Sequence, residues 1–212
     1  MKQKTTLKVG KGLFLTLLIT SICLFSLGII LDIVNFIDLG DSTSFSSGWP
    51  LYVSVVMDIL LCVAFVSASA TMLLWNPEDR GRTILLAAGL YVIICGIVSA
   101  ISGFMLSIHY YKVTYAISSI IAFLQIGIGS MALILRNRRC VDSMIINAVS
   151  FGVFAVSNLM TAISYVLAGQ ALLSIFSFIA IAFDVLMIVA LCLMKRESCQ
   201  DACSCEAASL DK

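Results

Sequence analysis

The chain has 212 residues, of which 61% are hydrophobic and only 12% are charged, and its formal net charge is +1. A soluble domain of this size could not cover so many apolar side chains with polar surface, so the composition predicts a protein whose solvent is lipid. The near-neutral charge also provides no basic surface of the kind that binds nucleic acid, and we expect no nucleic-acid partner.

Six long apolar segments follow one another along the chain. They lie at residues 13–36, 51–75, 83–107, 114–135, 144–168 and 171–194. Each is long enough for a helix to cross about 30 Å of hydrocarbon. Odd and even positions are both apolar, which is not the alternation of a lipid-facing β-barrel. The sequence therefore predicts an all-α, polytopic membrane protein, a bundle of six transmembrane helices.

The basic residues predict how this bundle is oriented. Twelve of the 13 Lys and Arg residues fall in stretches that six spans would place on one side of the membrane, and only Lys112 falls on the other. Short cytoplasmic loops retain such residues during insertion, so we expect both termini in the cytoplasm. The first apolar segment is longer than the core of a signal peptide and lacks a small-residue cleavage site, which predicts a retained helix. The expected membrane is the plasma membrane or a bacterial inner membrane.

These boundaries give three regions. A basic cytoplasmic N-terminus at 1–12 precedes a transmembrane domain at 13–194, and a tail at 195–212 contains several cysteines. Similar apolar-to-basic junctions recur after the second, fourth and sixth segments, at a spacing that suggests three helical hairpins of about 60 residues. Any six-helix protein with short loops would show the same spacing, which is the alternative interpretation.

The third segment carries Gly89, Gly96 and Gly103 at intervals of seven residues. Small residues let a neighbouring helix approach closely in lipid, where close packing and interhelical hydrogen bonds drive association. We expect this face to pack against another helix, either within the chain or in a second subunit or partner protein.

One face of the fifth segment is polar along its length. Its members fall within an arc of roughly 120° on a helix and include two candidate site residues, Asn158 and Thr161. The others are Asn147, Ser150, Ser157, Ser164 and Tyr165. Such a face should turn toward partner helices or a hydrated cavity. Alternatively, the Ser and Thr hydroxyls bond to their own helix backbone.

Acidic residues inside the apolar segments are the clearest functional signal. Asp58 and Asp184 lie within the second and sixth segments, and none of the six segments contains Lys, Arg or His. An isolated carboxylate at that depth would cost several kcal/mol. Asp184 is therefore expected to be protonated, to be hydrogen-bonded to Gln125 or the fifth-segment stripe, or to face water. The candidate intramembrane site comprises Asp58, Gln125, Asn158, Thr161 and Asp184; the alternative is that the acids are interhelical glue.

Four cysteines, Cys140, Cys199, Cys203 and Cys205, are expected close to the membrane on the cytoplasmic side. Four thiolates can bind zinc or copper, but their spacing is not the paired C-x2-C pattern. S-acylation is a second candidate role for membrane-proximal cysteines. We expect a short tail without a metal, and no cofactor. The cysteines inside the apolar segments, Cys95 among them, are expected to behave as small hydrophobic side chains.

Enzyme motifs are missing from the sequence, and its single histidine is His109, so we expect no enzymatic activity. The first hypothesis is a small transporter, or the membrane-embedded substrate-binding subunit of a larger one, that handles a cation, a proton-coupled solute or a small metabolite. In size and topology alone, the chain resembles the membrane subunits of vitamin-uptake systems. The alternative is a structural or regulatory protein that assembles with other membrane proteins, or with itself, through glycine and polar helix faces. Expected partners are the bilayer and a small cationic or neutral ligand.

Overall fold

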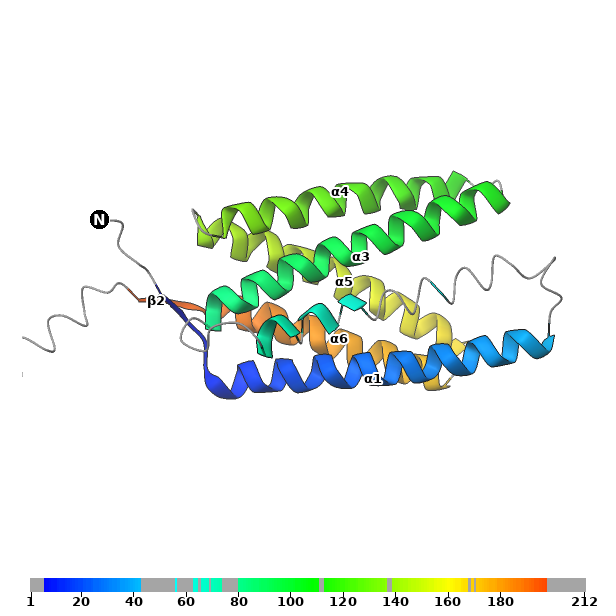
Figure 1. Ribbon diagram of the computed structural model, residues 1–212, viewed down its shortest axis with the longest axis horizontal. Coiled ribbons are helices and arrows are strands. Elements are labelled where there is room, and N and C mark those ends of the chain that lie inside the picture. The colour runs from blue at the N-terminus through cyan, green and yellow to red at the C-terminus, as the bar shows by residue number, and fades with distance from the viewer. Residues whose placement is uncertain are drawn as a thin grey trace, which may run out of the picture.

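The computed structural model describes residues 6–42, 56, 63–64, 66–68, 70–73, 80–110, 113–136, 139–167, 169 and 171–197. Most of these residues are helical (Figure 1). The elements in chain order are β1 (Thr6–Lys8), α1 (Lys11–Ser42), α3 (Arg80–Tyr110), α4 (Val113–Leu135), α5 (Cys140–Leu167), α6 (Ala171–Cys192) and β2 (Lys195–Glu197). The pieces 63–64, 66–68 and 70–73 are helical as well. Helices dominate because a chain in lipid must satisfy every backbone hydrogen bond within itself.

Four described helices are long and apolar enough to cross a membrane. They are Lys11–Leu31, Arg80–Met105, Cys140–Leu167 and Leu173–Cys192. The expected span 114–135 corresponds to α4, which contributes the shorter apolar stretch Ser119–Leu135. The expected span 51–75 lies mostly outside the described residues. The helical character of the described residues is confirmed, and four of their helices have the length and composition of membrane spans. The count of six spans stays a prediction.

The outward face of α5 shows what surrounds the helices. Val149, Val153, Val156 and Met160 follow one another at intervals of three or four residues, and each is 62% to 64% exposed. A continuous stripe of exposed apolar side chains is rare on a soluble monomer but is the normal surface of a helix that faces lipid. This stripe places the chain in a membrane as an integral protein.

The helices associate mainly as neighbours in the sequence. The two most extensive interfaces join α3 to α4 and α5 to α6, while α1 packs against α6 and α3 also contacts α5. The first turns of α1, α3 and α5 and the last turns of α4 and α6 all lie at the end of the molecule that carries the two strands (Figure 1). We call this the inner end and the opposite end the outer end.

The strand pair at the inner end was not foreseen from the sequence. β1 and β2 are antiparallel, with Leu7 opposite Arg196 and Lys8 opposite Lys195. Leu7 is buried, and a side chain at Gly81 on the first turn of α3 would come within 2.7 Å of the Leu7 carbonyl oxygen. Glycine at position 81 therefore allows the strand pair to lie directly on the start of α3.

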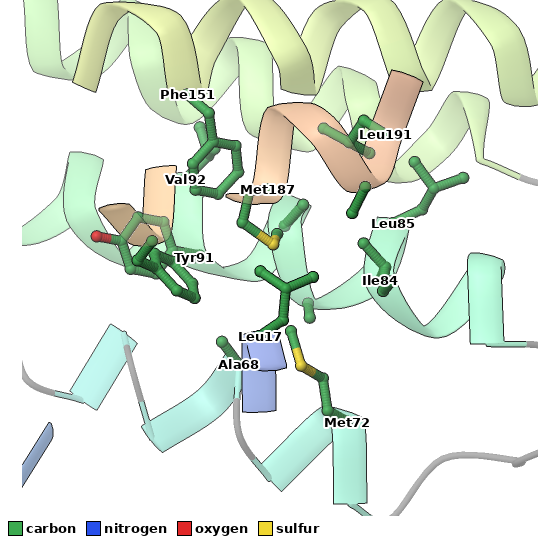
Figure 2. Close-up of a cluster of buried hydrophobic side chains, with 14 of the residues drawn as sticks. Leu17, Ala68, Met72, Ile84, Leu85, Tyr91, Val92, Phe151, Met187 and Leu191 are labelled. Atoms are coloured by element: carbon green, nitrogen blue, oxygen red, sulfur yellow. The ribbon is translucent and has the colours of Figure 1, made fainter. Parts of the chain in front are cut away.

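A hydrophobic core joins α1, α3 and α6 toward the inner end. Leu17, Ile84, Leu85, Met187 and Leu191 are fully or almost fully buried in it. Figure 2 shows Met187 and Leu17 pointing toward each other, with Met72 beside Leu17. Tyr91, Val92 and Phe151 lie at one side of the same cluster (Figure 2).

The turn between α5 and α6 depends on one glycine. Gly169 has a φ of 72°, in the left-handed region that side chains other than glycine rarely adopt, and its N–H bonds to the Val166 carbonyl at 3.1 Å. A left-handed residue after the last helical turn is a common way to end a helix. This tight turn returns the chain so that α6 runs beside α5 and brings Asp184 opposite Asn158.

Candidate functional site

Asp184 is the centre of the candidate site. It lies on α6 and is 0% exposed. Asn158 of α5 donates a hydrogen bond from Nδ2 to Oδ2 of Asp184, at 2.8 Å. The other carboxylate oxygen, Oδ1, is buried and accepts no hydrogen bond from any described residue. A buried polar atom without a partner is uncommon in proteins, so this oxygen has an open position for a donor.

The third wall of the site comes from α3. Cys95 is buried, and its thiol lies close enough to Asp184 for the two groups to interact electrostatically. Tyr91 lies one helical turn before Cys95 on α3, and its ring is 5.6 Å from the ring of Phe183, the residue before Asp184 on α6. The site is thus assembled from three helices, α3, α5 and α6.

A cluster of aromatic rings joins the same three helices. The Tyr91 ring stacks on Phe151, with centroids 5.4 Å apart, and lies 5.7 Å from Phe154 and 5.6 Å from Phe183. Phe154 is one turn before Asn158, and Phe183 is next to Asp184 in the sequence. The rings therefore pack against one another within about one helical turn of the Asn158–Asp184 pair along α5 and α6.

No basic side chain from the apolar segments balances Asp184, since those segments contain no Lys, Arg or His. Leaving a charge buried without a partner costs several kcal/mol. One hydrogen bond from Asn158 offsets only part of that cost. The site can therefore hold a proton or a positively charged ligand at Asp184.

The polar stripe of α5 contributes fewer side chains to the Asp184 site than its composition suggested. Ser150, Thr161 and Ser164 donate hydrogen bonds to the backbone carbonyls of Ile146, Ser157 and Met160 on their own helix. Ser157 and Ser164 are exposed, and Thr161 is half-buried. Asn158 of the stripe donates a side-chain hydrogen bond to Asp184 on α6, so the structure brings these two residues together. Thr161 is bonded to the backbone of its own helix.

Gln125 lies elsewhere. It is on α4, its Nε2 is buried, and that atom has no hydrogen-bond partner among the described residues. Asp184 does not receive a hydrogen bond from it. Asp58, the remaining member of the predicted site, lies outside the described residues.

A second buried amide, Asn147, lies on the same face of α5. It is 0% exposed, and its Nδ2 donates to the Ser143 carbonyl at 2.9 Å, while its Oδ1 has no described partner. It precedes Asn158 by about 16 Å along the helix, since each residue rises 1.5 Å. Asn147 is therefore separate from the Asp184 site.

Two site residues were missed by the sequence analysis. The sequence predicts Cys95 to behave as a small hydrophobic side chain, and Tyr91 is not among the predicted site residues. Their spacing of four residues places them on one face of a helix, which is the signal that the sequence offers. Nothing in the sequence, however, indicates that this face of α3 meets α6 at Asp184.

The glycine face of α3 is occupied by α4. A Cβ atom added to Gly96 would lie 2.8 Å from Ile126 Cγ1 and 3.1 Å from the Ala122 carbonyl oxygen. Gly89 lies against Leu133, and Gly103 is buried. The small residues at 89 and 96 thus allow an intramolecular helix contact.

The cysteines predicted near the inner membrane surface fall in two groups. Cys140 begins α5 and is half-buried. Cys199, Cys203 and Cys205 lie outside the described residues. Within the described part of the chain, three or more His, Cys, Asp or Glu residues do not come together in a way that could hold a metal ion.

Comparison with known proteins gives the chain no family. No protein-family model, no curated protein and no solved structure matches it. The geometry of the helices and of the Asp184 site is therefore the basis for assigning a function to this integral membrane protein.

Proposed function

We propose that the chain is a small transporter, or the membrane-embedded substrate-binding subunit of a larger one, in which Asp184 binds a proton or a cation. The observation that carries this proposal is the fully buried carboxylate with one oxygen bonded to Asn158 and the other without a described partner. Ionisable residues inside membrane bundles commonly mark pathways for ions, protons and substrates. The protein acts without catalysing a chemical reaction.

The arrangement also supports a pathway through the bundle. Asp184 lies where three helices meet, so a relative movement of α5 and α6 against α3 would change what the carboxylate contacts. Binding at the interface of helices that can rock against each other is the usual basis of alternating access. The ligand would therefore enter and leave as these interfaces open.

One observation argues against the alternative function, which is assembly with other membrane proteins. Gly89 and Gly96 face α4 within the same chain, so this part of the glycine face is not left open for another protein. The bond between Asn158 and Asp184 is the observation that still favours a purely structural role, because it joins α5 to α6.

A flux experiment separates the two functions. The full chain is reconstituted in liposomes that contain a pH-sensitive dye, and inorganic cations, cationic metabolites and vitamins are added under an imposed proton gradient. We expect solute-dependent proton movement in the wild type and a loss of at least about tenfold in Asp184→Asn, which corresponds to 1.4 kcal/mol or more of lost interaction. Gel filtration in detergent checks that the variant is folded.

Asp142→Asn is the matched control, because Asp142 is a partly exposed carboxylate that lies 3.8 Å from Arg139 near the inner end of α5. It should retain wild-type flux. The absence of flux with any solute would overturn the transport proposal. Equal flux in wild type and a folded Asp184→Asn protein would instead overturn the role of Asp184 in transport and identify it as a structural hydrogen-bonding residue.

A further inference from the structure

We infer that the strand pair at the inner end, together with the first turn of α3, binds the headgroup of an anionic phospholipid. This inference goes beyond the proposed function and does not depend on transport through Asp184. It follows from three observations: the depth of the strand pair in the membrane, the charges on its facing positions, and the basic residues that begin the helices beside it.

The strand pair lies at the edge of the membrane. The candidate span of α1 begins at Lys11, three residues after the end of β1, and the candidate span of α6 ends at Cys192, three residues before the start of β2. Three residues reach at most about 10 Å. The headgroup layer occupies about 5–7 Å on each side of the hydrocarbon core. Both strands are therefore at or close to the level of the lipid phosphates.

Like charges occupy facing positions in the strand pair. Lys8 is the Cα partner of Lys195 in the antiparallel register, and Thr6 is the partner of Glu197. Successive positions alternate between the two faces of a strand, so positions 8 and 195 are on the face opposite to that of Leu7, which is buried. Two positive charges at directly opposed positions destabilise a pair of strands. An anion bound at this face would remove that repulsion.

Basic residues also begin the helices next to the strand pair. Arg80 and Arg82 flank Gly81 in the first turn of α3, and a Cβ atom added to Gly81 would lie 2.7 Å from the Leu7 carbonyl oxygen. Helix α1 begins with Lys11, and the first turns of α1 and α3 contain no acidic residue. The N-terminus of a helix carries partial positive charge, which makes a basic residue there unfavourable. The strand pair thus adjoins two helix ends whose charge also favours an anion.

A lipid phosphate is the anion that this position favours. Basic residues in cytoplasmic loops set the orientation of a membrane protein, but that role does not require two of them to face each other across a strand pair. Clusters of roughly four to eight Lys and Arg residues next to a span bind the anionic lipids of the cytoplasmic leaflet. The competing anions within the chain are Glu197 in β2 and, outside the described residues, Glu78, Asp79 and the acids of the tail.

Thermal unfolding of the purified full-length protein in a zwitterionic detergent tests the lipid. The probes are phosphatidylglycerol and phosphatidylcholine with identical acyl chains, titrated into the micelles, and sodium phosphate and glycerol phosphate in solution. A ligand that binds the folded state raises the unfolding temperature with its concentration. We expect a saturable rise with phosphatidylglycerol that weakens in high salt, and no saturable rise with the other three. An equal rise with phosphatidylcholine or with either soluble phosphate would overturn the inference.

The double variant Lys8→Gln/Lys195→Gln tests the site, because it removes the two facing charges and keeps polar side chains. It should weaken the apparent affinity for phosphatidylglycerol roughly 5- to 30-fold, the loss expected for one to two basic residues at a membrane surface. Without phosphatidylglycerol the same variant should unfold at a higher temperature than the wild type, because the repulsion between facing lysines is gone.

The matched control is Arg138→Gln/Arg139→Gln, which removes the same charge from the connection between α4 and α5. It should retain the wild-type affinity for phosphatidylglycerol. An equal loss of affinity in the two double variants would overturn the strand pair as the site, because basic residues elsewhere at the inner end would then serve as well. Unchanged affinity in Lys8→Gln/Lys195→Gln would overturn it too.

Hydrogen exchange supplies a measurement that needs no variant. In the wild type, the backbone amides of residues 6–8 and 195–197 should exchange more slowly with phosphatidylglycerol than with phosphatidylcholine, because a bound headgroup stabilises the strand pair against local opening. Equal exchange in the two lipids would overturn the inference. The proteoliposome flux through Asp184 decides the proposed function separately.

Discussion

At Asp184 the two oxygens of one carboxylate have different surroundings. Oδ2 accepts the Asn158 hydrogen bond at 2.8 Å, while Oδ1 lies buried without a described donor. An amide is a weak substitute for a basic residue, because it donates a hydrogen bond but brings no charge. The pair can thus stabilise the contact between α5 and α6 while Oδ1 has no described donor.

Replacing Asn158 tests how much the fold depends on this bond. Asn158→Leu keeps the branched shape of the side chain but removes the donor, leaving both Asp184 oxygens without a described partner. The free energy of unfolding in detergent should fall by about 1–3 kcal/mol, the usual cost of leaving a buried polar group unsatisfied. Chemical denaturation of the purified protein measures the change.

The neighbouring Ser157→Ala provides the control, because Ser157 is exposed on the same helix turn. It should change the stability by less than about 0.5 kcal/mol, as most surface substitutions do. If Asn158→Leu lowered the stability no more than Ser157→Ala, the hydrogen bond to Asp184 would contribute nothing to the folded state.

At the scale of helices, close packing joins α3 to α4 through small residues on both. Gly129 of α4 would place an added Cβ atom 2.8 Å from Ile93 Cγ1 on α3, just as Gly96 of α3 approaches Ile126 of α4. Ser119 Oγ also donates to the Ala100 carbonyl at 3.3 Å across this interface. Tight contact and backbone hydrogen bonding replace the hydrophobic effect as the source of helix association in lipid.

Gly96→Ala should push α3 and α4 slightly apart and lower the stability of the fold. The added Cβ would lie 3.1 Å from both the Ala122 carbonyl oxygen and the Ile126 nitrogen, and backbone atoms cannot move away as a flexible side chain can. Overpacking of this kind costs typically 1–3 kcal/mol, and we expect a loss of about that size in unfolding experiments in detergent.

Gly127→Ala is the matched control on α4, since nothing lies within 4 Å of a Cβ added there. This substitution should leave the stability unchanged or raise it by up to about 1 kcal/mol through its higher helix propensity. Equal effects of the two substitutions would show that the close approach at Gly96 does not limit the packing of α3 on α4.

On the scale of the whole molecule, the basic ends of the described helices gather with the strand pair at the inner end (Figure 1). β1 and β2 hold residues from near both ends of the chain side by side. The first and last described residues therefore lie at the same end of the bundle, and the distribution of Lys and Arg predicts that this end faces the cytoplasm.

Epitope tags on the two termini test this orientation. Protease added to sealed right-side-out vesicles should remove neither tag, and protease added to inside-out vesicles should remove both, because the membrane shields whatever lies inside the vesicle. Cleavage of only one tag in either preparation would contradict an even number of spans. Removal of both tags in right-side-out vesicles would reverse the orientation.

The candidate site was only partly predictable. Asp184 was identified because a carboxylate in an apolar helix is costly wherever the helix lies, and Asn158 because it belongs to a polar face. Gln125 satisfied the same criteria, yet the fold places it on α4 without a hydrogen bond to Asp184. A helical position fixes the face on which a residue lies but not which helix covers that face.

The sequence by itself determined the solvent and the helical character, because long apolar segments without basic residues have few other stable states than membrane helices. It did not determine the strand pair, since β1 and β2 are three residues each and join positions nearly 190 residues apart, a pairing without a local signal. Only the tertiary structure placed Tyr91 and Cys95 beside Asp184 and closed the glycine face of α3 with α4. These contacts depend on how helices rotate and cross, which packing between distant segments decides.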